Sequence, residues 1–426
     1  MKSHVWMGAC ALALLTGSLM ANDWPQWRGV HRDGKATEKG LKLDWNGQAP
    51  KHLWTTDGMG GGYASVSVVN GRLYTTGNLP EGQGVICVDA NSGKLLWSTA
   101  VTPEQPKHGY EGSRCTPTVD GEFLYTVTSN GLLTCLRAND GEIVWTREFK
   151  DFGGKMMSGW GFSESPLVDG DLVLCTPGGS EAMIVALNKV NGEVVWKSAV
   201  PDLGDAGKPG AGYASIVVSN GGGVKQYVTL VGQGVIGVRA SDGKYMWGYN
   251  PVANGTANIP TPIVLGDHIF ASSGYGTGAC LLELKSDGNG GVTASEKYFL
   301  EAKTFQNHHG QMVAEGEYIY AGHDHNKGFP ICLHWPTGEV KWVEQDKERM
   351  KERNWEGSAA ITKVNDQILF RYQNGSLALV TASPAGFESK GSFMPAYQEG
   401  KSWAHPVVVG DKLYLREQNK LMCYQL

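Results

Sequence analysis

The stretch Gly192-Glu193-Val194-Val195-Trp196 is one of five segments with the pattern Gly-Lys/Glu-x-x-Trp. The other four are residues 93–97, 141–145, 243–247 and 338–342. In each segment a turn-forming or polar residue precedes the glycine, as Asn191 precedes Gly192. Such dipeptides between apolar runs indicate a tight hairpin turn, because glycine accepts the positive φ that the turn needs. The repetition therefore predicts several similar units, each with a β-hairpin.

A second turn lies 24 to 26 residues before most of these tryptophans. Its copies are Asn70-Gly71, Asp120-Gly121, Asp169-Gly170 and Glu315-Gly316. A strand-like stretch follows each copy, for example residues 72–75. Each unit therefore contains four antiparallel strands, A to D, within roughly 45–50 residues, which is the pattern of a propeller blade.

Counting the units predicts an all-β, eight-bladed β-propeller of four-stranded antiparallel blades. The blades are expected at residues 63–101, 114–149, 164–200, 213–249, 259–300, 309–345, 357–393 and 403–426. The last has only three strands. Residues 51–56, which include Trp54, would supply its fourth and close the ring, leaving no exposed sheet edge there. The domains are thus a signal peptide at 1–21, an N-terminal arm at 22–50 and the propeller at 51–426.

The charge balance argues against a nucleic-acid binder. The 426 residues carry 37 Lys and Arg against 42 Asp and Glu, a formal net charge of −5. Neutralising phosphates requires a basic stripe, which this composition does not provide. High aromatic content with a small net charge also excludes a disordered chain.

The first residues are typical of an export signal. Lys2 and His4 precede the apolar run 5–15, and small residues lead to Ala21, where cleavage is expected. No later run of about 20 apolar residues exists, so we expect a protein that does not span a membrane. The predicted location is the periplasm or the exterior of the cell.

The repeated Cys and Trp residues have a structural interpretation. Cys87, Cys135 and Cys332 each lie six residues before the glycine of the strand C–D turn, and Cys423 occupies the matching strand of the last blade. This register predicts a small buried position rather than a redox or metal site. The repeated tryptophans are expected to pack between blades. Cys115, Cys175 and Cys280 fall in other strands and could be free or paired.

The combined pattern resembles the pyrroloquinoline-quinone-like (PQQ-like) β-propeller repeat over essentially the whole mature chain. The opening residues 23–29, with 160–166, 254–262, 307–310 and 402–406, resemble an exported subgroup of about 400 residues. The resemblance implies distant similarity to the quinoprotein alcohol dehydrogenases and to a non-catalytic scaffold, the outer-membrane β-barrel assembly lipoprotein. The vicinal Cys-Cys pair and the Cys-x-x-Cys-His haem segment of the dehydrogenases are not present in this sequence.

Polar or aromatic residues precede most of the predicted A strands. In a propeller the D–A and B–C loops share one face, so these residues are expected at the mouth of the central channel. The set is Arg114, Trp160, Glu164, Asn258, His308, His309, Glu356, Trp403 and His405. Two interpretations remain open: the residues cap strands and fill the axis, or they form a polar ligand pocket.

Two kinds of metal site are conceivable in these loops. His308, His309, His323, Asp324 and His325 belong to two loops of the sixth blade that face the same side, and such ligands suit a transition metal. Glu164 with Asn258 could instead offer oxygen ligands to Ca²⁺, which would matter for PQQ. We nevertheless expect no cofactor as the leading hypothesis.

The leading hypothesis for function is an exported, non-catalytic binding or scaffold propeller of the cell envelope. Its partner would be an envelope protein, or a small polar or carbohydrate ligand at the channel mouth, and the chain is expected to be a monomer. The alternative is a PQQ- or metal-dependent oxidoreductase acting on alcohols or sugars. Common nucleophile, phosphate-loop and zinc-protease motifs are not found in the sequence. The charge run 347–353 is expected to form a solvated loop or short helix.

Overall fold

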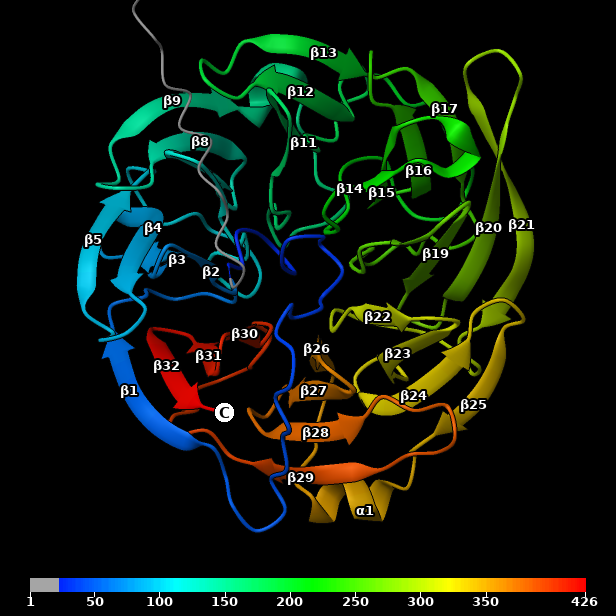
Figure 1. The fold of residues 1–426 in the computed structure, drawn as a ribbon. Coiled ribbons are helices and arrows are strands. Elements are labelled where there is room, and N and C mark those ends of the chain that lie inside the picture. The colour runs from blue at the N-terminus through cyan, green and yellow to red at the C-terminus, as the bar shows by residue number, and fades with distance from the viewer. Residues whose placement is uncertain (1–22) are drawn as a thin grey trace, which may run out of the picture.

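The computed structural model describes residues 23–426. In this part of the chain, eight four-stranded antiparallel sheets surround a central axis, which confirms the predicted eight-bladed propeller (Figure 1). The predicted signal peptide at 1–21 lies outside the described residues. Among the described residues, no helix has the length and apolar character needed to cross a bilayer.

The first four blades follow each other in chain order. Their strands are β2 (Ser67–Val69), β3 (Arg72–Leu79), β4 (Gly82–Asp89) and β5 (Leu95–Ala100); β6 (Thr118–Asp120), β7 (Phe123–Val127), β8 (Leu132–Arg137) and β9 (Ile143–Glu148); β10 (Leu167–Asp169), β11 (Leu172–Cys175), β12 (Ile184–Asn188) and β13 (Val194–Ser198); and β14 (Val217–Ser219), β15 (Gln226–Val231), β16 (Gly234–Arg239) and β17 (Tyr245–Tyr249).

The remaining blades complete the ring. Their strands are β18 (Ile263–Leu265), β19 (His268–Ser273), β20 (Gly278–Ser286) and β21 (Val292–Glu301); β22 (Met312–Glu315), β23 (Tyr318–His323), β24 (Phe329–His334) and β25 (Glu339–Val343); β26 (Ala359–Val364), β27 (Gln367–Tyr372), β28 (Leu377–Thr381) and β29 (Ser389–Phe393); and β30 (Val407–Val409), β31 (Lys412–Glu417) and β32 (Lys420–Gln425). Helical segments are short: η1 (Phe149–Phe152), η2 (Gly221–Gly223) and α1 (Lys347–Glu352). The short-helix interpretation of the charge run is thereby confirmed.

The N-terminal strand closes the ring as predicted. Strand β1 (Lys51–Asp57) pairs antiparallel with β32, with Lys51 opposite Gln425 and Thr55 opposite Met422. Figure 1 shows β1 beside β32 in this eighth blade, close to the C-terminus. Residues from the two ends of the sequence therefore form one sheet, so the ring has no gap between its first and last blades.

The repeated tryptophans pack between blades, as the sequence predicts. Trp54, Trp97, Trp145 and Trp196 each lie against the C–D turn glycine of the next blade, so that a β-carbon at Gly93 would be 2.7 Å from the ring of Trp54. Gly141 meets Trp97 in the same way, and Gly192 meets Trp145. These glycines also have positive φ angles, so glycine is required there for both conformation and space.

The cysteines are buried. Cys87, Cys135, Cys332 and Cys423 lie on the third strand of their blades and are fully buried, which confirms the register argument. Cys115, Cys175 and Cys280 are also buried, and all seven cysteines of the described chain are free thiols. Burial raises the pKa of Cys115 to about 11, so this thiol is not an activated nucleophile.

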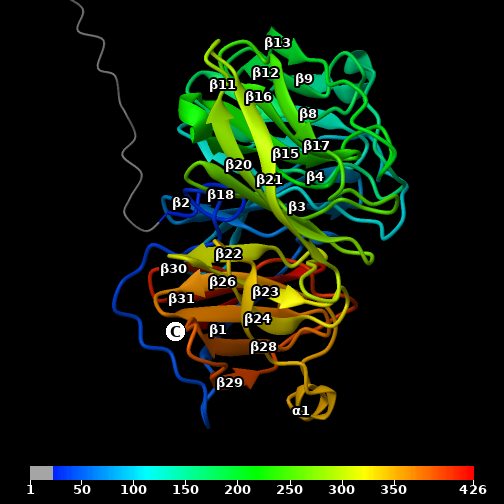
Figure 2. The ribbon, with the colours of Figure 1, turned by 90° about the vertical axis from the view of Figure 1, so that its right-hand side faces the viewer.

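The N-terminal arm crosses the axis on one face of the ring. Trp24 bridges to Val68 in β2, Pro25 accepts a hydrogen bond from the Val119 amide, and the Ala36 amide donates to the Lys363 carbonyl. All three contacts are with first strands of blades, namely β2, β6 and β26. Figure 2 shows the arm on one side of the disk and α1, which lies in a D–A loop, on the other. The arm thus covers one end of the channel.

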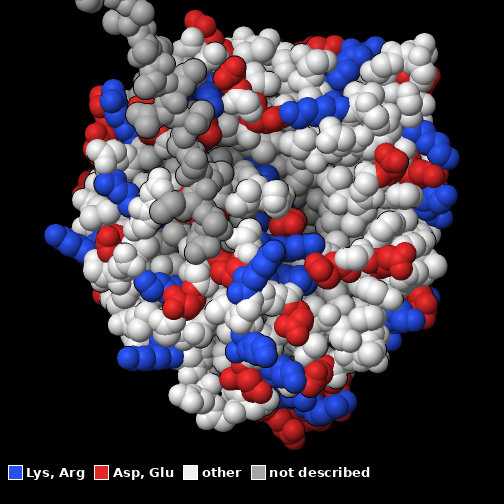
Figure 3. All heavy atoms as spheres, in the orientation of Figure 1, with Lys and Arg blue, Asp and Glu red and all other residues white. Residues whose placement is uncertain are grey.

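Charges of both signs are mixed over the arm-covered face. Figure 3 shows Lys and Arg side chains interspersed with Asp and Glu around its rim, without a continuous basic stripe. Many of these charges form exposed ion pairs, such as Lys225 with Asp169. Exposed pairs of this kind contribute little to stability.

Candidate functional site

A cavity of about 300 Å³ lies at the axis, at the end of the channel opposite the arm. It is lined mainly by residues just before the first strand of each blade. Tyr63 lies seven residues, and Ser65 five residues, before Asn70, the first residue of the β2–β3 turn. Side chains of an extended chain alternate between two faces, so positions separated by two point the same way. The pocket is therefore built from two equivalent positions of the repeat.

We count from the first residue after each first strand, which is residue 70, 121, 170, 220, 266, 316, 365 or 410. The upper ring is the eight residues seven positions earlier, and the lower ring is the eight residues five positions earlier. The upper ring is Tyr63, Arg114, Ser163, Tyr213, Ile259, His309, Ser358 and Trp403. The lower ring is Ser65, Thr116, Ser165, Ser215, Thr261, Gln311, Ala360 and His405. Every upper-ring residue except Ser358 lines the cavity.

The upper ring makes the walls aromatic. Tyr63 and Trp403 lie 4.6 Å apart between ring centroids, and Tyr110 meets Trp403 edge-on at 5.2 Å. Trp160 and Tyr213 form a further pair at 6.0 Å. Aromatic rings supply large apolar faces at low conformational cost, so these walls suit the flat face of a ring compound.

The lower ring is a relay of hydrogen bonds from blade to blade. The Thr116 amide donates to Ser165 Oγ at 3.0 Å, and the Ser165 amide donates to Ser215 Oγ at 3.0 Å. The Ser215 amide then donates to Thr261 Oγ1 at 3.2 Å, and the Thr261 amide to Gln311 Oε1 at 2.7 Å. Each side chain satisfies a buried backbone N–H of its neighbour, which fixes the hydroxyls at the axis.

The arm contributes to the far end of the cavity. Trp27 lines it and packs edge-on against His405, with ring centroids 4.7 Å apart. Beside Trp27, the buried Arg32 donates to the carbonyls of Ser165 and Pro166, which anchors the arm to the third blade. The axial channel is therefore closed behind the pocket by the arm.

The charge of the pocket is positive. Within the described chain, Arg114 and Lys401 line the cavity and no Asp or Glu does. Arg114 donates to the carbonyls of Trp160 and Gly109 and lies over the Tyr63 ring at 5.4 Å. Burial lowers its pKa to about 10, so it stays charged at neutral pH. Lys401 reaches over Tyr110, with Nζ 4.7 Å from the ring centroid.

Four histidines of the lining are uncharged at neutral pH. Burial, with smaller contributions from neighbouring positive groups, lowers the pKa of His308 and His405 to about 3 and that of His309 well below its usual range. Burial also lowers the pKa of His325. His308 and His325 lie 4.0 Å apart between ring centroids. Neutral imidazoles offer one donor and one acceptor each.

The structure gathers only part of the predicted metal set. His308, His309 and His325 line the cavity, whereas His323 and Asp324 do not. The Nδ1 atom of His323 instead faces the Gln306 amide at 3.3 Å. Among the described residues, no three His, Cys, Asp or Glu side chains are grouped as a metal ion requires.

Six of the nine predicted mouth residues line the cavity: Arg114, Trp160, His308, His309, Trp403 and His405. Glu164 and Asn258 do not, because both side chains are buried and engage backbone groups instead. Glu164 accepts from the Thr176 amide, and the Asn258 amide donates to two backbone carbonyls. Glu356 lines a neighbouring hollow instead, which shares Gln373 and Lys401 with the cavity.

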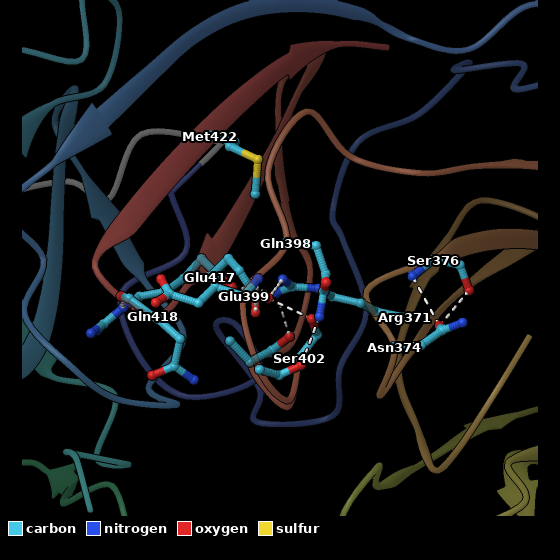
Figure 4. Close-up of polar contacts among 12 residues, drawn as sticks. Arg371, Asn374, Ser376, Gln398, Glu399, Ser402, Glu417, Gln418 and Met422 are labelled. Atoms are coloured by element: carbon cyan, nitrogen blue, oxygen red, sulfur yellow. Dashed lines mark hydrogen bonds and ion pairs between the residues drawn. The ribbon is translucent and has the colours of Figure 1, made fainter.

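A buried ionic network holds the loop that carries Lys401 and Trp403 (Figure 4). The Glu417 carboxylate accepts from Arg371 at 2.6 Å, from Ser402 Oγ at 2.5 Å and from the Glu399 amide at 3.1 Å. Arg371 and Glu417 are almost wholly inaccessible to solvent. Eighth-blade and seventh-blade strands thereby position one wall of the pocket.

Sequence reasoning missed Trp27, Tyr63, Tyr110, Tyr213, Tyr275 and Lys401. Tyr63 and Tyr213 occupy the upper-ring position, so counting back from the turn would have found them. Trp27 belongs to a distinctive opening motif, but nothing local indicates that the arm reaches the axis. Lys401 depends on a loop fold that is set by contacts with other blades.

Comparison with known proteins supports the fold and the family. The family described as outer membrane protein assembly factor BamB matches residues 81–344. A quinoprotein alcohol dehydrogenase, PedH of Pseudomonas putida, is 28% identical over 141 residues, which cover 32% of this chain and 22% of that enzyme. The matched part thus spans about a fifth of the enzyme's length.

Two solved structures are similar in fold. BamB from Moraxella catarrhalis has a TM-score of 0.62 at 12% identity, covering 89% of this chain and 100% of that one. Quinohemoprotein alcohol dehydrogenase from Comamonas testosteroni has a TM-score of 0.64 at 14% identity, covering 95% and 80%. At these identities the likeness concerns the fold alone, because one fold supports many functions.

Proposed function

Because this chain belongs to the family described as outer membrane protein assembly factor BamB, we propose that it is a binding propeller with a ligand pocket at its axis. The ligand we propose is a small, negatively charged compound with a ring that fits between the aromatic walls. The protein acts at an exported location, for which the pattern of residues 1–21 is the support.

One observation carries this proposal. The aromatic-walled cavity of about 300 Å³ is lined by two cationic side chains, Arg114 and Lys401, and by no carboxylate within residues 23–426. Neither cation is neutralised by an ion pair in the described chain, since Arg114 donates to carbonyls and Lys401 lies over aromatic rings. An uncompensated positive charge that is partly buried attracts an anion more strongly than it would in bulk water. The volume is within the range of small-molecule sites.

A quinone-dependent oxidoreductase acting on alcohols or sugars is the second candidate. The partial match to a quinoprotein dehydrogenase favours it. A bound Ca²⁺ requires carboxylate and carbonyl oxygens. The cavity lining of the described chain includes no carboxylate, and Asn258, whose Oδ1 accepts from the amide and the Nδ2 of Asn254, does not line it. These residues do not fit a Ca²⁺-assisted quinone site, so no reaction step is derived through one.

A titration followed by tryptophan fluorescence tests the proposal, because Trp27, Trp160 and Trp403 line the cavity. The probes are D-glucuronate, benzoate and PQQ, with D-glucose and benzyl alcohol as neutral counterparts, each in EDTA and in Ca²⁺. We expect at least one of the acids to give a saturable change in fluorescence that EDTA does not alter. This acid should bind about tenfold more tightly than its neutral counterpart. If no acid saturates below about 10 mM, the proposal is wrong. Binding of PQQ that requires Ca²⁺ would favour the second candidate.

A further inference from the structure

We propose that the pocket recognises a sugar acid, a hydroxylated ring that carries one carboxylate. This inference rests on the proposed function, because it assigns a ligand class to the same pocket. It comes from how hydrogen-bonding groups and cations are distributed between the two rings and around the axis.

The lower ring supplies unused donors on one side of the axis. Ser215 and Thr261 each accept a backbone N–H in the relay, but neither hydroxyl donates to an acceptor within the described chain. Both side chains are 4% exposed and line the cavity. The Nε2 of Gln311, next in the relay, likewise has no partner among the described residues. Buried hydrogen-bond donors that are fixed in place and have no acceptor favour a ligand that brings oxygen acceptors.

The cations lie on the other side. Arg114 belongs to the second blade and Lys401 to the loop before the eighth, whereas Ser215, Thr261 and Gln311 belong to the fourth to sixth blades. A ligand that reaches both groups must have a negative end toward Lys401 and a neutral, oxygen-rich end toward Thr261. A carboxylate is the natural partner of the cationic end.

The remaining polar lining favours hydroxyl groups over a second charge. Apart from the two cations, the polar residues that line the cavity are serines, a threonine, tyrosines, amides, neutral histidines and three tryptophans. Most of these side chains both donate and accept, as a hydroxyl does. A second carboxylate placed beside Ser215 and Thr261 would lose its water without gaining a side-chain cation within that part of the lining, which is costly. A polyhydroxylated ring would be satisfied there at lower cost.

The walls suit such a ring. Tyr63 and Trp403 present a pair of aromatic faces beside Lys401, and Trp160 and Tyr213 line the wall toward the fourth blade. A sugar ring has C–H groups on its faces and hydroxyls at its edge. Its faces can therefore lie on the apolar walls while its edge meets the lower-ring hydroxyls.

Isothermal titration of the purified protein with D-glucuronate, D-galacturonate, D-glucose and benzoate tests the inference. We expect at least one uronate to bind about tenfold more tightly than both glucose, which lacks the charge, and benzoate, which lacks the hydroxyls. Benzoate binding more tightly than both uronates would overturn the sugar-acid assignment and leave the anion pocket standing. Failure of all four to bind, together with PQQ, would overturn the proposed function itself.

Two variants, each with a matched control, test which side chains contact the ligand. Lys401→Met should weaken uronate binding about tenfold and leave glucose unchanged, whereas the exposed Lys94→Met should change neither. Thr261→Ala should weaken the binding of both sugars. Its control is Thr116→Ala, because Thr116 also accepts a neighbouring amide in the relay but does not line the cavity.

The pair of threonine variants keeps the test independent of stability. Both lose one acceptor for a buried amide, so similar melting temperatures are expected. If Thr116→Ala weakens uronate binding as much as Thr261→Ala does, the effect is structural and the assignment of Thr261 to the ligand is wrong. If Lys94→Met weakens uronate binding as much as Lys401→Met does, the assignment of Lys401 to the ligand is wrong.

Discussion

Arg371 and Glu417 form an ion pair of 2.6 Å in which both side chains are almost fully buried, 0% and 1% exposed. The pair joins the second strand of the seventh blade, β27, to that of the eighth, β31. Arg371 also donates to the carbonyls of Ala404 and Arg416. Since Glu417 holds Ser402 and the Glu399 amide, the pair links the seam between the seventh and eighth blades to the pocket wall (Figure 4).

Glu417→Gln should therefore destabilise the protein strongly. It leaves the Arg371 charge buried without a counter-ion, and breaking such a pair costs about 3–5 kcal/mol. Urea denaturation of the variant measures the loss. The control is Glu339→Gln, which removes an exposed partner of Lys341 and should cost below about 1 kcal/mol. A cost for Glu417→Gln as small as that of its control would show that the pair does not stabilise the seam.

Removing residues 23–57 should abolish the cooperative unfolding transition. The deletion removes β1, so β32 becomes an unpaired edge, and it removes the arm that bridges several first strands. Deletion of 23–46 alone keeps β1 and should lower the melting temperature while a single transition persists. Calorimetry of both proteins distinguishes these outcomes. A melting curve unchanged by the longer deletion would contradict the role of closure.

Gly93→Ala should cost more stability than Gly121→Ala. Both glycines have positive φ, about +71° and +59°, so each substitution carries a backbone penalty of roughly 1–2 kcal/mol. Only at Gly93 would the new β-carbon lie 2.7 Å from the Trp54 ring, whereas at Gly121 nothing lies within 4 Å. Overpacking adds about 1–3 kcal/mol at Gly93. Equal losses of unfolding free energy in chemical denaturation would show that the Trp54 side chain moves aside at no cost in stability.

Much of this architecture could be predicted because it repeats. The glycine-to-tryptophan spacing indicates a local hairpin. Its recurrence along the sequence predicts the number of blades and the closure of the ring by residues 51–56. The residues of the pocket were harder to predict. Glu164 and Asn258 stand next to pocket positions, but their side chains are buried and bond to backbone groups instead of lining the cavity, which sequence spacing does not reveal. Trp27 and Lys401 reach the pocket through contacts distant in sequence, which no local pattern records.

Acidification should destabilise the protein through its pocket histidines. Burial lowers the folded-state pKa of His405 to about 3, below the value near 6.5 expected in the unfolded chain. The unfolded chain therefore binds more protons between these values, so stability is fully present above pH 6.5 and is lost as the pH falls. The groups that face His405 are Trp27, Arg28, His309 and Arg371, none of them a carboxylate.

At pH 5 the loss from His405 alone is about 2 kcal/mol. His405→Gln should therefore show a shallower fall of unfolding free energy between pH 7 and pH 5 than the unsubstituted protein. His52→Gln serves as the control, because His52 is exposed near the chain's closing strand. The same slope in His405→Gln and in the unsubstituted protein would contradict the buried, uncharged state of this imidazole.

The buried Glu164 should have the opposite pH dependence. Burial raises its pKa to about 7, partly offset by hydrogen bonds from Thr176 and by the charge of Arg32. The folded chain then binds the extra proton between about pH 4.5 and 7, so this group's contribution is fully present at low pH and is lost as the pH rises. Glu164→Gln keeps an acceptor for the Thr176 amide but cannot ionise. The variant should gain stability over the unsubstituted protein on going from pH 5 to pH 8, by up to about 3 kcal/mol. Urea denaturation at both values measures this gain, and Glu339→Gln, at an exposed site, should show none. A constant difference between Glu164→Gln and the unsubstituted protein would mean that Glu164 is already ionised at pH 5, held so by Arg32 despite its burial.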